Sequence, residues 1–174
     1  MVELRAKSAL KSTRVLLAED DPIMLSLIRD VLNVMGFGEV VVARDGRKAL
    51  QDIMLQSFDL VFCDWLMPDM NGIEFTKAIR RLPDYEKCCV PIVMLTGKAM
   101  LEDVRTARDA GVNEYLIKPF SVDMLCTKIR AVIDHPRQYV LSDTYSGPDR
   151  RRKAEPEKIP FGKDRRIEKG ILAG

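Results

Sequence analysis

Acidic residues, a hydroxyl and a lysine follow hydrophobic segments at four separate places in this sequence. They are Glu19 with Asp20, then Asp64, then Thr96, then Lys118. Carboxylates that are brought together repel one another unless a cation lies between them, and an all-oxygen, partly hydrated site suits Mg²⁺. A carboxylate can also act as a nucleophile and form an aspartyl phosphate, whose oxygens a lysine and a hydroxyl would stabilise. If these residues converge, they predict a magnesium site at which Asp64 accepts a phosphoryl group.

Each of these residues also has an ordinary structural explanation. The EDDP sequence at 19–22 is typical of a helix N-terminus, and for Asp21 we prefer that interpretation. Asp64 could be a turn residue after a strand, and a single lysine before a proline indicates little. The joint occurrence at four consecutive strand ends is what favours the chemical interpretation.

Hydrophobic runs alternate with segments of helical periodicity five times between residues 14 and 133. This alternation predicts an α/β fold with one parallel sheet and helices on both of its faces. Sites in such sheets form beyond the carboxyl ends of the strands, so the four groups above should meet at one edge. The predicted strands are Arg14–Ala18, Glu39–Ala43, Asp59–Cys63, Val90–Leu95 and Glu114–Ile117. The predicted helices are Pro22–Met35, Asp45–Gln56, Asn71–Arg81, Ala99–Ala110 and Ser121–Ile133.

The composition changes after this segment. We predict an N-terminal extension at 1–13, one domain at 14–134 and an arginine-rich tail at 135–174. The tail carries ten Lys and Arg against six Asp and Glu, while the rest of the chain has two more acidic than basic residues. Its prolines and glycines and its few apolar residues predict a largely irregular segment that is disordered, or ordered only by a partner. Its charge favours an anionic partner.

Four motifs in the predicted domain resemble the receiver domain of response regulators, the CheY-like family. They are LLAEDDP, DLVFCDWLMPDMNGIEF, PIVMLTG and GVNEYLIKPF, and the resemblance extends from about residue 14 to 133. It implies a five-stranded, doubly wound sheet of the flavodoxin-like and CheY-like type. It also implies that Asp64 is phosphorylated by a histidine kinase or a phosphotransferase, and that Lys118 binds the phosphate. Such a chain is not an enzyme beyond assisting its own phosphoryl transfer and dephosphorylation.

The same resemblance implies roles for further residues. Asp20 would bind Mg²⁺ directly and Glu19 through water, and the backbone carbonyl of Leu66 would be a further ligand beside Asp64. Thr96 and Tyr115 would be the switch pair that responds to phosphorylation. The bond between Lys118 and Pro119 is typically cis in this family.

Two segments of the tail repeat one another fifteen residues apart, as GPDRR at 147–151 and GKDRR at 162–166. Arginine can pair bidentately with guanine or phosphate, and an aspartate can accept from guanine's other edge. Two such units suit cyclic di-GMP, which has two guanines and two phosphates. The tail also resembles that of single-domain receivers that bind cyclic di-GMP and act on the flagellar motor. The candidate ligand residues are Asp149, Arg150, Arg151, Arg152, Asp164, Arg165 and Arg166.

Other functions of the tail stay open. It could be a solvated charge run, or the receiver could be a plain phosphorelay component whose tail binds a protein or nucleic acid. The tail lacks the pair of periodic helices that a conventional DNA-binding output domain requires. DNA is therefore an unfavoured partner. A hydrolase built on the same acids is the least favoured alternative. The cysteine spacing, the charged N-terminus and the short apolar runs predict a cytoplasmic protein without membrane insertion.

Overall fold

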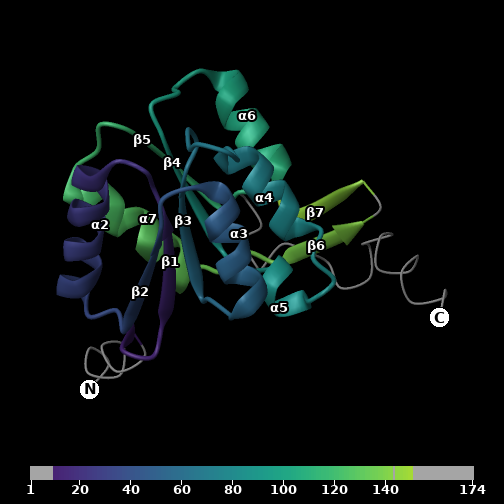
Figure 1. Ribbon diagram of the computed structural model, residues 1–174. Coiled ribbons are helices and arrows are strands. Elements are labelled where there is room, and N and C mark those ends of the chain that lie inside the picture. Colours follow the sequence, from purple (N-terminus) through teal and green to yellow (C-terminus); the bar gives the residue numbers. More distant parts are fainter. Residues whose placement is uncertain (1–9, 143, 151–174) are drawn as a thin grey trace.

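The body of the computed structural model is a five-stranded parallel sheet covered by helices, and the model describes residues 10–142 and 144–150 (Figure 1). The predicted fold class is therefore confirmed. The strands of the body are β1 (Arg14–Ala18), β2 (Glu39–Ala43), β3 (Leu60–Asp64), β4 (Ile92–Thr96) and β5 (Glu114–Ile117). The helices are α2 (Pro22–Met35), α3 (Gly46–Leu55), α4 (Gly72–Arg80), α5 (Tyr85–Cys88), α6 (Leu101–Ala110) and α7 (Val122–Asp134).

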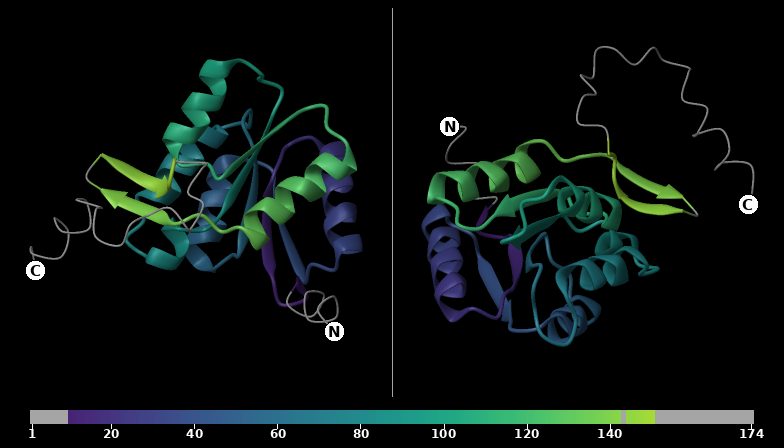
Figure 2. Two further views of the ribbon diagram at one scale, coloured as in Figure 1. Left: turned by 180° about the vertical axis from the view of Figure 1, so that it is seen from behind. Right: turned by 90° about the horizontal axis from the view of Figure 1, so that it is seen from above.

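The sheet has the strand order β2-β1-β3-β4-β5, with every neighbouring pair parallel. Helices α2 and α7 pack on one face of the sheet and share a hydrophobic core with it (Figure 2). Helices α3, α4 and α6 cover the other face, where buried hydrophobic residues form two further core clusters. The chain passes outward from β1 to β2 and then returns to the other side of β1. The order therefore reverses between β1 and β3, and a crevice opens at their carboxyl ends.

Side-chain caps fix the helix ends beside this crevice. The Asp21 carboxylate accepts a hydrogen bond of 2.8 Å from the amide of Ile23 at the start of α2, which confirms the capping role predicted for it. At the other end of the same helix, away from the crevice, Gly36 has a φ of 91°, a conformation that favours glycine. Asn71 begins α4 through a capping box with Glu74. Local sequence signals thus determine where the helices enter and leave.

The boundaries of two strands differ from the prediction in a way that concerns the site. β3 extends through Asp64, and β4 extends through Thr96, so both residues are the last of their strands rather than loop residues. The short helix α5 was not predicted. Its single turn is capped by Asp84, and one turn is too short to show helical periodicity.

The prediction that the segment after residue 134 has no packed structure is wrong for its first part. β6 (Tyr139–Ser142) and β7 (Tyr145–Pro148) form an antiparallel hairpin beside α4, α5 and α6 (Figure 1). The Tyr139 hydroxyl donates a 2.5 Å hydrogen bond to the carbonyl of Cys88 in the body. The hairpin needs no core of its own because it packs on the body of the fold.

One buried arginine joins the body to this hairpin. Arg80 is buried, with 4% of its surface exposed. Its guanidinium donates hydrogen bonds to the backbone carbonyls of Gly111 at 3.0 Å, Cys88 at 2.7 Å and Val90 at 2.8 Å. It also lies 5.4 Å from the centroid of the Tyr139 ring. Burial lowers the pKa of this guanidinium. Arg80 thus satisfies carbonyl groups from three segments at the base of the hairpin.

None of the helices in the described part of the chain combines the length and the hydrophobicity that a bilayer crossing needs.

Candidate functional site

Three carboxylates converge where β1 and β3 end. Glu19 and Asp20 follow β1 directly, and Asp64 is the last residue of β3. One ligand oxygen from each of the three lies within 4.8 Å of the others. Because β1 and β3 are parallel neighbours, Glu19 and Asp64 lie close together although they are 45 positions apart in the sequence. Their positions at the ends of predicted strands had indicated this.

Lys118 completes the cluster from the end of β5. Its ammonium group lies 2.7 Å from Oε2 of Glu19 and 3.0 Å from Oδ2 of Asp64. Burial alone would lower the pKa of this lysine, but its hydrogen bonds with the two carboxylates raise the pKa overall. The Lys118–Pro119 bond is cis, as the family resemblance implied. A single cation thus contacts both a buried acid and Asp64.

Lys118 does not compensate the full charge of the three carboxylates among the described residues. Glu19 is completely buried, and burial raises the pKa of its carboxyl to about 7, with Asp64 adding to the rise and Lys118 opposing it. Three carboxylates face one lysine, so a further cation would relieve their repulsion. Hard oxygen donors at the open side of a polar cluster are the ligands that Mg²⁺ prefers. The donor set therefore fits Mg²⁺.

Thr96 and Tyr115 are connected through the backbone of Lys98. Oγ1 of the fully buried Thr96 accepts a hydrogen bond of 3.0 Å from the amide of Lys98. The carbonyl of Lys98 in turn accepts a hydrogen bond of 2.7 Å from the Tyr115 hydroxyl. The half-buried Tyr115 ring contacts Trp65 edge-on at 6.3 Å between centroids, and burial raises the pKa of Tyr115. The Lys98 ammonium lies 4.8 Å from the centroid of the Trp65 ring. A shift of Thr96 would thus reach Tyr115 through the backbone of a single residue, Lys98.

Sequence reasoning missed two residues that shape this site. A β carbon on Gly72 would collide with the backbone oxygen of Asp64, so only glycine fits there. The Asn71–Gly72 pair in the motif after Asp64 was the available signal. Trp65 also went unnoticed, because its position next to Asp64 reveals nothing of its contacts with Lys98 and Tyr115. The carbonyl of Leu66 stays a predicted metal ligand.

Two of the candidate tail residues, Asp149 and Arg150, are among the described residues, and both lie at the hairpin rather than in this cluster. Arg150 lies at the base of the hairpin, where its guanidinium is 3.4 Å from Oδ1 of Asp109 and 3.8 Å from the centroid of the Tyr145 ring. The backbone amide of Asp149 donates a hydrogen bond of 2.8 Å to the carbonyl of Gln138. Gly147 and Pro148 of the first repeat are part of β7. The other candidates lie outside the described residues: Arg151, Arg152, Asp164, Arg165 and Arg166.

The chain matches the family model of the response regulator receiver domain over residues 15–130. Chemotaxis protein CheY-3 of Vibrio cholerae is 35% identical over 124 residues, which are 71% of this chain and 94% of that protein. Chemotaxis protein CheY of Pseudomonas aeruginosa is 33% identical over 121 residues, 70% of this chain and 96% of that protein. Both similarities cover the body of the fold.

Solved structures show the same architecture. The receiver domain of a sensor histidine kinase from Pseudomonas aeruginosa, with a magnesium ion coordinated in its active-site cleft, has a TM-score of 0.63 and 30% identity. The matched region covers 70% of this chain and 98% of the chain of that receiver domain. Vibrio cholerae chemotaxis protein CheY4 has a TM-score of 0.63 and 32% identity, and the match covers 69% of this chain and 98% of the CheY4 chain. The acidic cluster and Lys118 lie within residues 15–130, the range that the family model matches.

Proposed function

This chain belongs to the response-regulator receiver family, and from that premise we propose that it is a cytoplasmic two-component switch phosphorylated on Asp64. The phosphoryl donor would be a histidine kinase or a phosphotransferase. The observation that carries the proposal is the contact of Lys118 with both Glu19 and Asp64 inside a cluster of three carboxylates. Phosphoryl transfer from a small donor such as acetyl phosphate is the measurement that tests it.

The residues at the sheet edge support such a transfer. A carboxylate oxygen of Asp64 attacks the phosphorus of a phosphohistidine, the new O–P bond forms as the P–N bond breaks, and the imidazole leaves with its electron pair. Lys118 lies close enough to Asp64 to pair with the phosphoryl oxygens, and the Thr96 hydroxyl can donate to another. Bound by Glu19, Asp20 and Asp64, Mg²⁺ would neutralise negative charge on the phosphoryl group.

Magnesium should stabilise the folded chain. At about 100 times its Kd, an ion that binds only the folded state adds about 2.7 kcal/mol to the free energy of unfolding. Asp20→Asn should remove most of this gain, because it deletes a carboxylate from the exposed side of the cluster. Thermal unfolding with and without MgCl₂ measures the effect, and Asp30→Asn on the surface of α2 is the matched control. An equal gain in Asp20→Asn and the control would contradict the assignment.

Phosphorylation should shift Thr96 and Tyr115 together. A phosphoryl group on Asp64 would draw the Thr96 hydroxyl inward, disturb its bond with the Lys98 amide, and free the Tyr115 ring to turn toward the core. NMR with beryllofluoride, a phosphoryl mimic, should show changes at Lys98, Tyr115 and along α6. In Thr96→Val the changes near Asp64 should persist while those at Tyr115 disappear. Shifts confined to the loop after Asp64 in the unaltered chain would refute the coupling.

The two curated relatives are named chemotaxis proteins. This supports an output in motility, with the flagellar motor or another protein as the target.

We further propose that the tail binds cyclic di-GMP and tunes that output. The support is the repeated Asp-Arg-Arg unit and the basic excess of residues 135–174. In the first unit, Arg150 already packs on Tyr145, so part of the ordering that binding requires is present before the ligand arrives. The remaining guanidinium groups, Arg151, Arg152, Arg165 and Arg166, would pair with phosphate and guanine, and Asp149 and Asp164 with the guanine edges.

Loss of one unit should weaken this binding strongly. Each charge-assisted hydrogen bond contributes about 1.5–3 kcal/mol, so the double substitution Arg150→Ala and Arg151→Ala should cost more than about tenfold in Kd. Lys158→Ala, between the units, should cost far less. Calorimetry at several salt concentrations should also show preference over cyclic di-AMP, whose adenine lacks the O6 acceptor. Equal affinity for both dinucleotides would make the tail a nonspecific polycation.

A further inference from the structure

Two neighbouring cysteines lie side by side at the end of the short helix α5. Cys88 is the last residue of the helix and Cys89 follows it as the C-cap, and their Sγ atoms are 3.7 Å apart. Cys88 is buried and Cys89 is partly exposed. Because α5 precedes β4, the pair lies at the amino-terminal edge of the sheet, away from the acidic cluster. We call the two thiols the Cys88–Cys89 dithiol.

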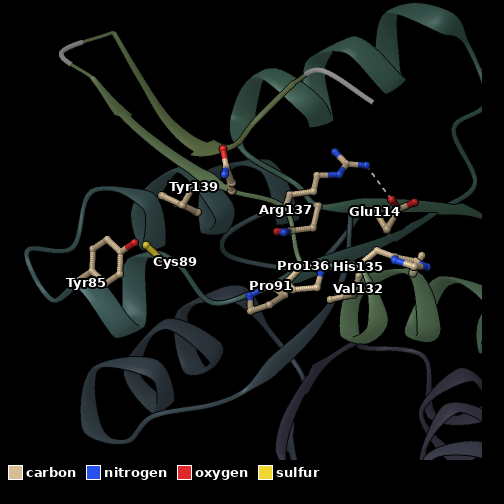
Figure 3. Close-up of a pocket in the computed structure, with 12 residues that line it drawn as sticks. Tyr85, Cys89, Pro91, Glu114, Val132, His135, Pro136, Arg137 and Tyr139 are labelled. Atoms are coloured by element: carbon tan, nitrogen blue, oxygen red, sulfur yellow. Dashed lines mark hydrogen bonds and ion pairs between the residues drawn. The ribbon is translucent and has the colours of Figure 1, made fainter. Parts of the chain in front are cut away.

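A cavity of about 550 Å³ gives small molecules access to this dithiol (Figure 3). Cys89 lines the cavity, and its sulfur lies beside the Tyr85 hydroxyl, with which it forms a hydrogen bond. The volume is within the range of small-molecule sites. The wall also includes two tyrosine rings and two prolines, which are Tyr85, Tyr139, Pro91 and Pro136. An aromatic or apolar group could therefore occupy the cavity while an atom attached to it meets the sulfurs.

The spacing of the two sulfurs suits a single bridging atom. At a bond length to sulfur of about 2.3 Å, two sulfurs 3.7 Å apart subtend an angle of about 107° at the atom between them. A direct disulfide fits less well, because its S–S bond is only about 2.05 Å long. The Cα atoms of neighbouring residues, about 3.8 Å apart, are also closer than the minimum of about 4.4 Å that disulfides usually show. The spacing thus favours a bridging atom over a disulfide.

The number of donors identifies the class of this bridging atom. A structural Zn²⁺ site takes four ligands. Among residues 10–142 and 144–150, no third Cys, His, Asp or Glu completes a metal-binding group with the two cysteines. A trivalent metalloid such as arsenic forms three bonds, and in an organic arsenical one of them is already a bond to carbon. Two thiols therefore complete its coordination.

The protonation of the dithiol points to the same class. Burial raises the pKa of Cys89 to about 11, and the hydrogen bond with Cys88 adds to the rise, so Cys89 carries its proton at neutral pH. Zn²⁺ binds thiolates and must first displace such protons. An organic arsenoxide, R–As=O, reacts with the thiols themselves. Two As–S bonds form as the As=O bond breaks, and both thiol protons leave with the oxygen as one water, without a change of oxidation state.

The dithiol is also part of the junction between the body and the hairpin. The backbone carbonyl of Cys88 accepts hydrogen bonds from the Arg80 guanidinium at 2.7 Å and from the Tyr139 hydroxyl at 2.5 Å. This carbonyl belongs to the peptide unit that joins the two cysteines. An atom that bridges their sulfurs therefore restrains the peptide unit on which Tyr139 of the hairpin is anchored.

We propose that the Cys88–Cys89 dithiol is a covalent binding site for trivalent organic arsenicals. The two sulfurs chelate the arsenic, and its organic group lies in the cavity beside Tyr85 and Tyr139. The hairpin junction responds because it shares the Cys88 carbonyl. This site requires neither Asp64 nor the tail, so it goes beyond the receiver function.

Intact-mass spectrometry of the full chain with phenylarsine oxide tests the site. In excess glutathione, a monothiol, the unaltered chain should gain the mass of one phenylarsine oxide less one water. Two linked bonds exceed one in affinity by about 10²–10⁴-fold, so Cys89→Ser, which leaves one sulfur of the pair, should bind at least about a hundredfold more weakly. Cys126→Ser is the matched control, because it removes a partly exposed cysteine from α7, and it should bind like the unaltered chain.

A second variant and a second reagent test the chelation itself. Cys88→Ser should lose binding as Cys89→Ser does, with circular dichroism to verify that both variants are folded. The dithiol reagent 2,3-dimercaptopropanol should remove the arsenical, whereas glutathione should not. Binding should also shift the NMR amide signals of Cys88, Cys89 and Tyr139. If Cys89→Ser binds as tightly as Cys126→Ser, or if glutathione strips the arsenical from the unaltered chain, the two cysteines are not a chelating site.

Discussion

Asp64→Asn should abolish labelling of the chain by acetyl phosphate in the presence of Mg²⁺. The amide keeps the shape of the carboxylate but has no anionic oxygen to attack phosphorus. Glu19 is a poor substitute, because it is completely buried against Lys118. Mass spectrometry of the intact chain should therefore detect phosphate on the unaltered protein and none on the variant.

Two controls make this outcome specific. Asp30→Asn removes a carboxylate from the exposed surface of α2 and should be labelled like the unaltered chain. Thermal unfolding of Asp64→Asn should show a folded protein, since asparagine can still accept from Lys118. Labelling of Asp64→Asn at a level similar to that of the control would show that another residue accepts the phosphoryl group.

The site could be predicted from the sequence because a parallel sheet brings its strand ends together. Glu19, Asp64 and Lys118 each follow or end a hydrophobic run, so their positions along the chain determine their positions in space. Local caps such as Asp21 and Gly36 were equally visible, because a cap depends on residues within one turn. The route from Thr96 to Tyr115 through Lys98 was not visible, since it depends on side-chain geometry.

The hairpin could not be predicted either, because it depends on contacts between residues that are distant in the sequence. Its strands have four residues each, and the turn between them lacks the Asn-Gly or Asp-Gly pair that marks a tight hairpin. An isolated two-stranded hairpin is marginal in water, so its order comes from contacts with the body. Those contacts involve Gly111 and Arg80, which are remote in sequence. Arg80 itself has the position of an ordinary basic residue in a last helical turn.

Arg80→Ala should destabilise the protein by about 3–5 kcal/mol, because it leaves three buried carbonyls without their donor. The substitution leaves the carbonyls of Gly111, Cys88 and Val90 without their donor and removes the cation beneath the Tyr139 ring. Each buried acceptor left unsatisfied costs about 1–3 kcal/mol, partly recovered where water enters. Urea unfolding of the full chain measures the loss.

Arg81→Ala is the matched control, because it removes a neighbouring arginine whose side chain is exposed. Its free energy of unfolding should change by no more than about 0.5 kcal/mol. Arg80→Lys should lie between the two, since an ammonium has three donors but lacks the planar fork that reaches carbonyls of three segments. Because Tyr139 packs on Arg80, the amides of the hairpin should also exchange faster with solvent in Arg80→Ala than in Arg81→Ala. If Arg80→Ala and Arg81→Ala unfold at the same urea concentration, Arg80 does not stabilise the junction between the body and the hairpin.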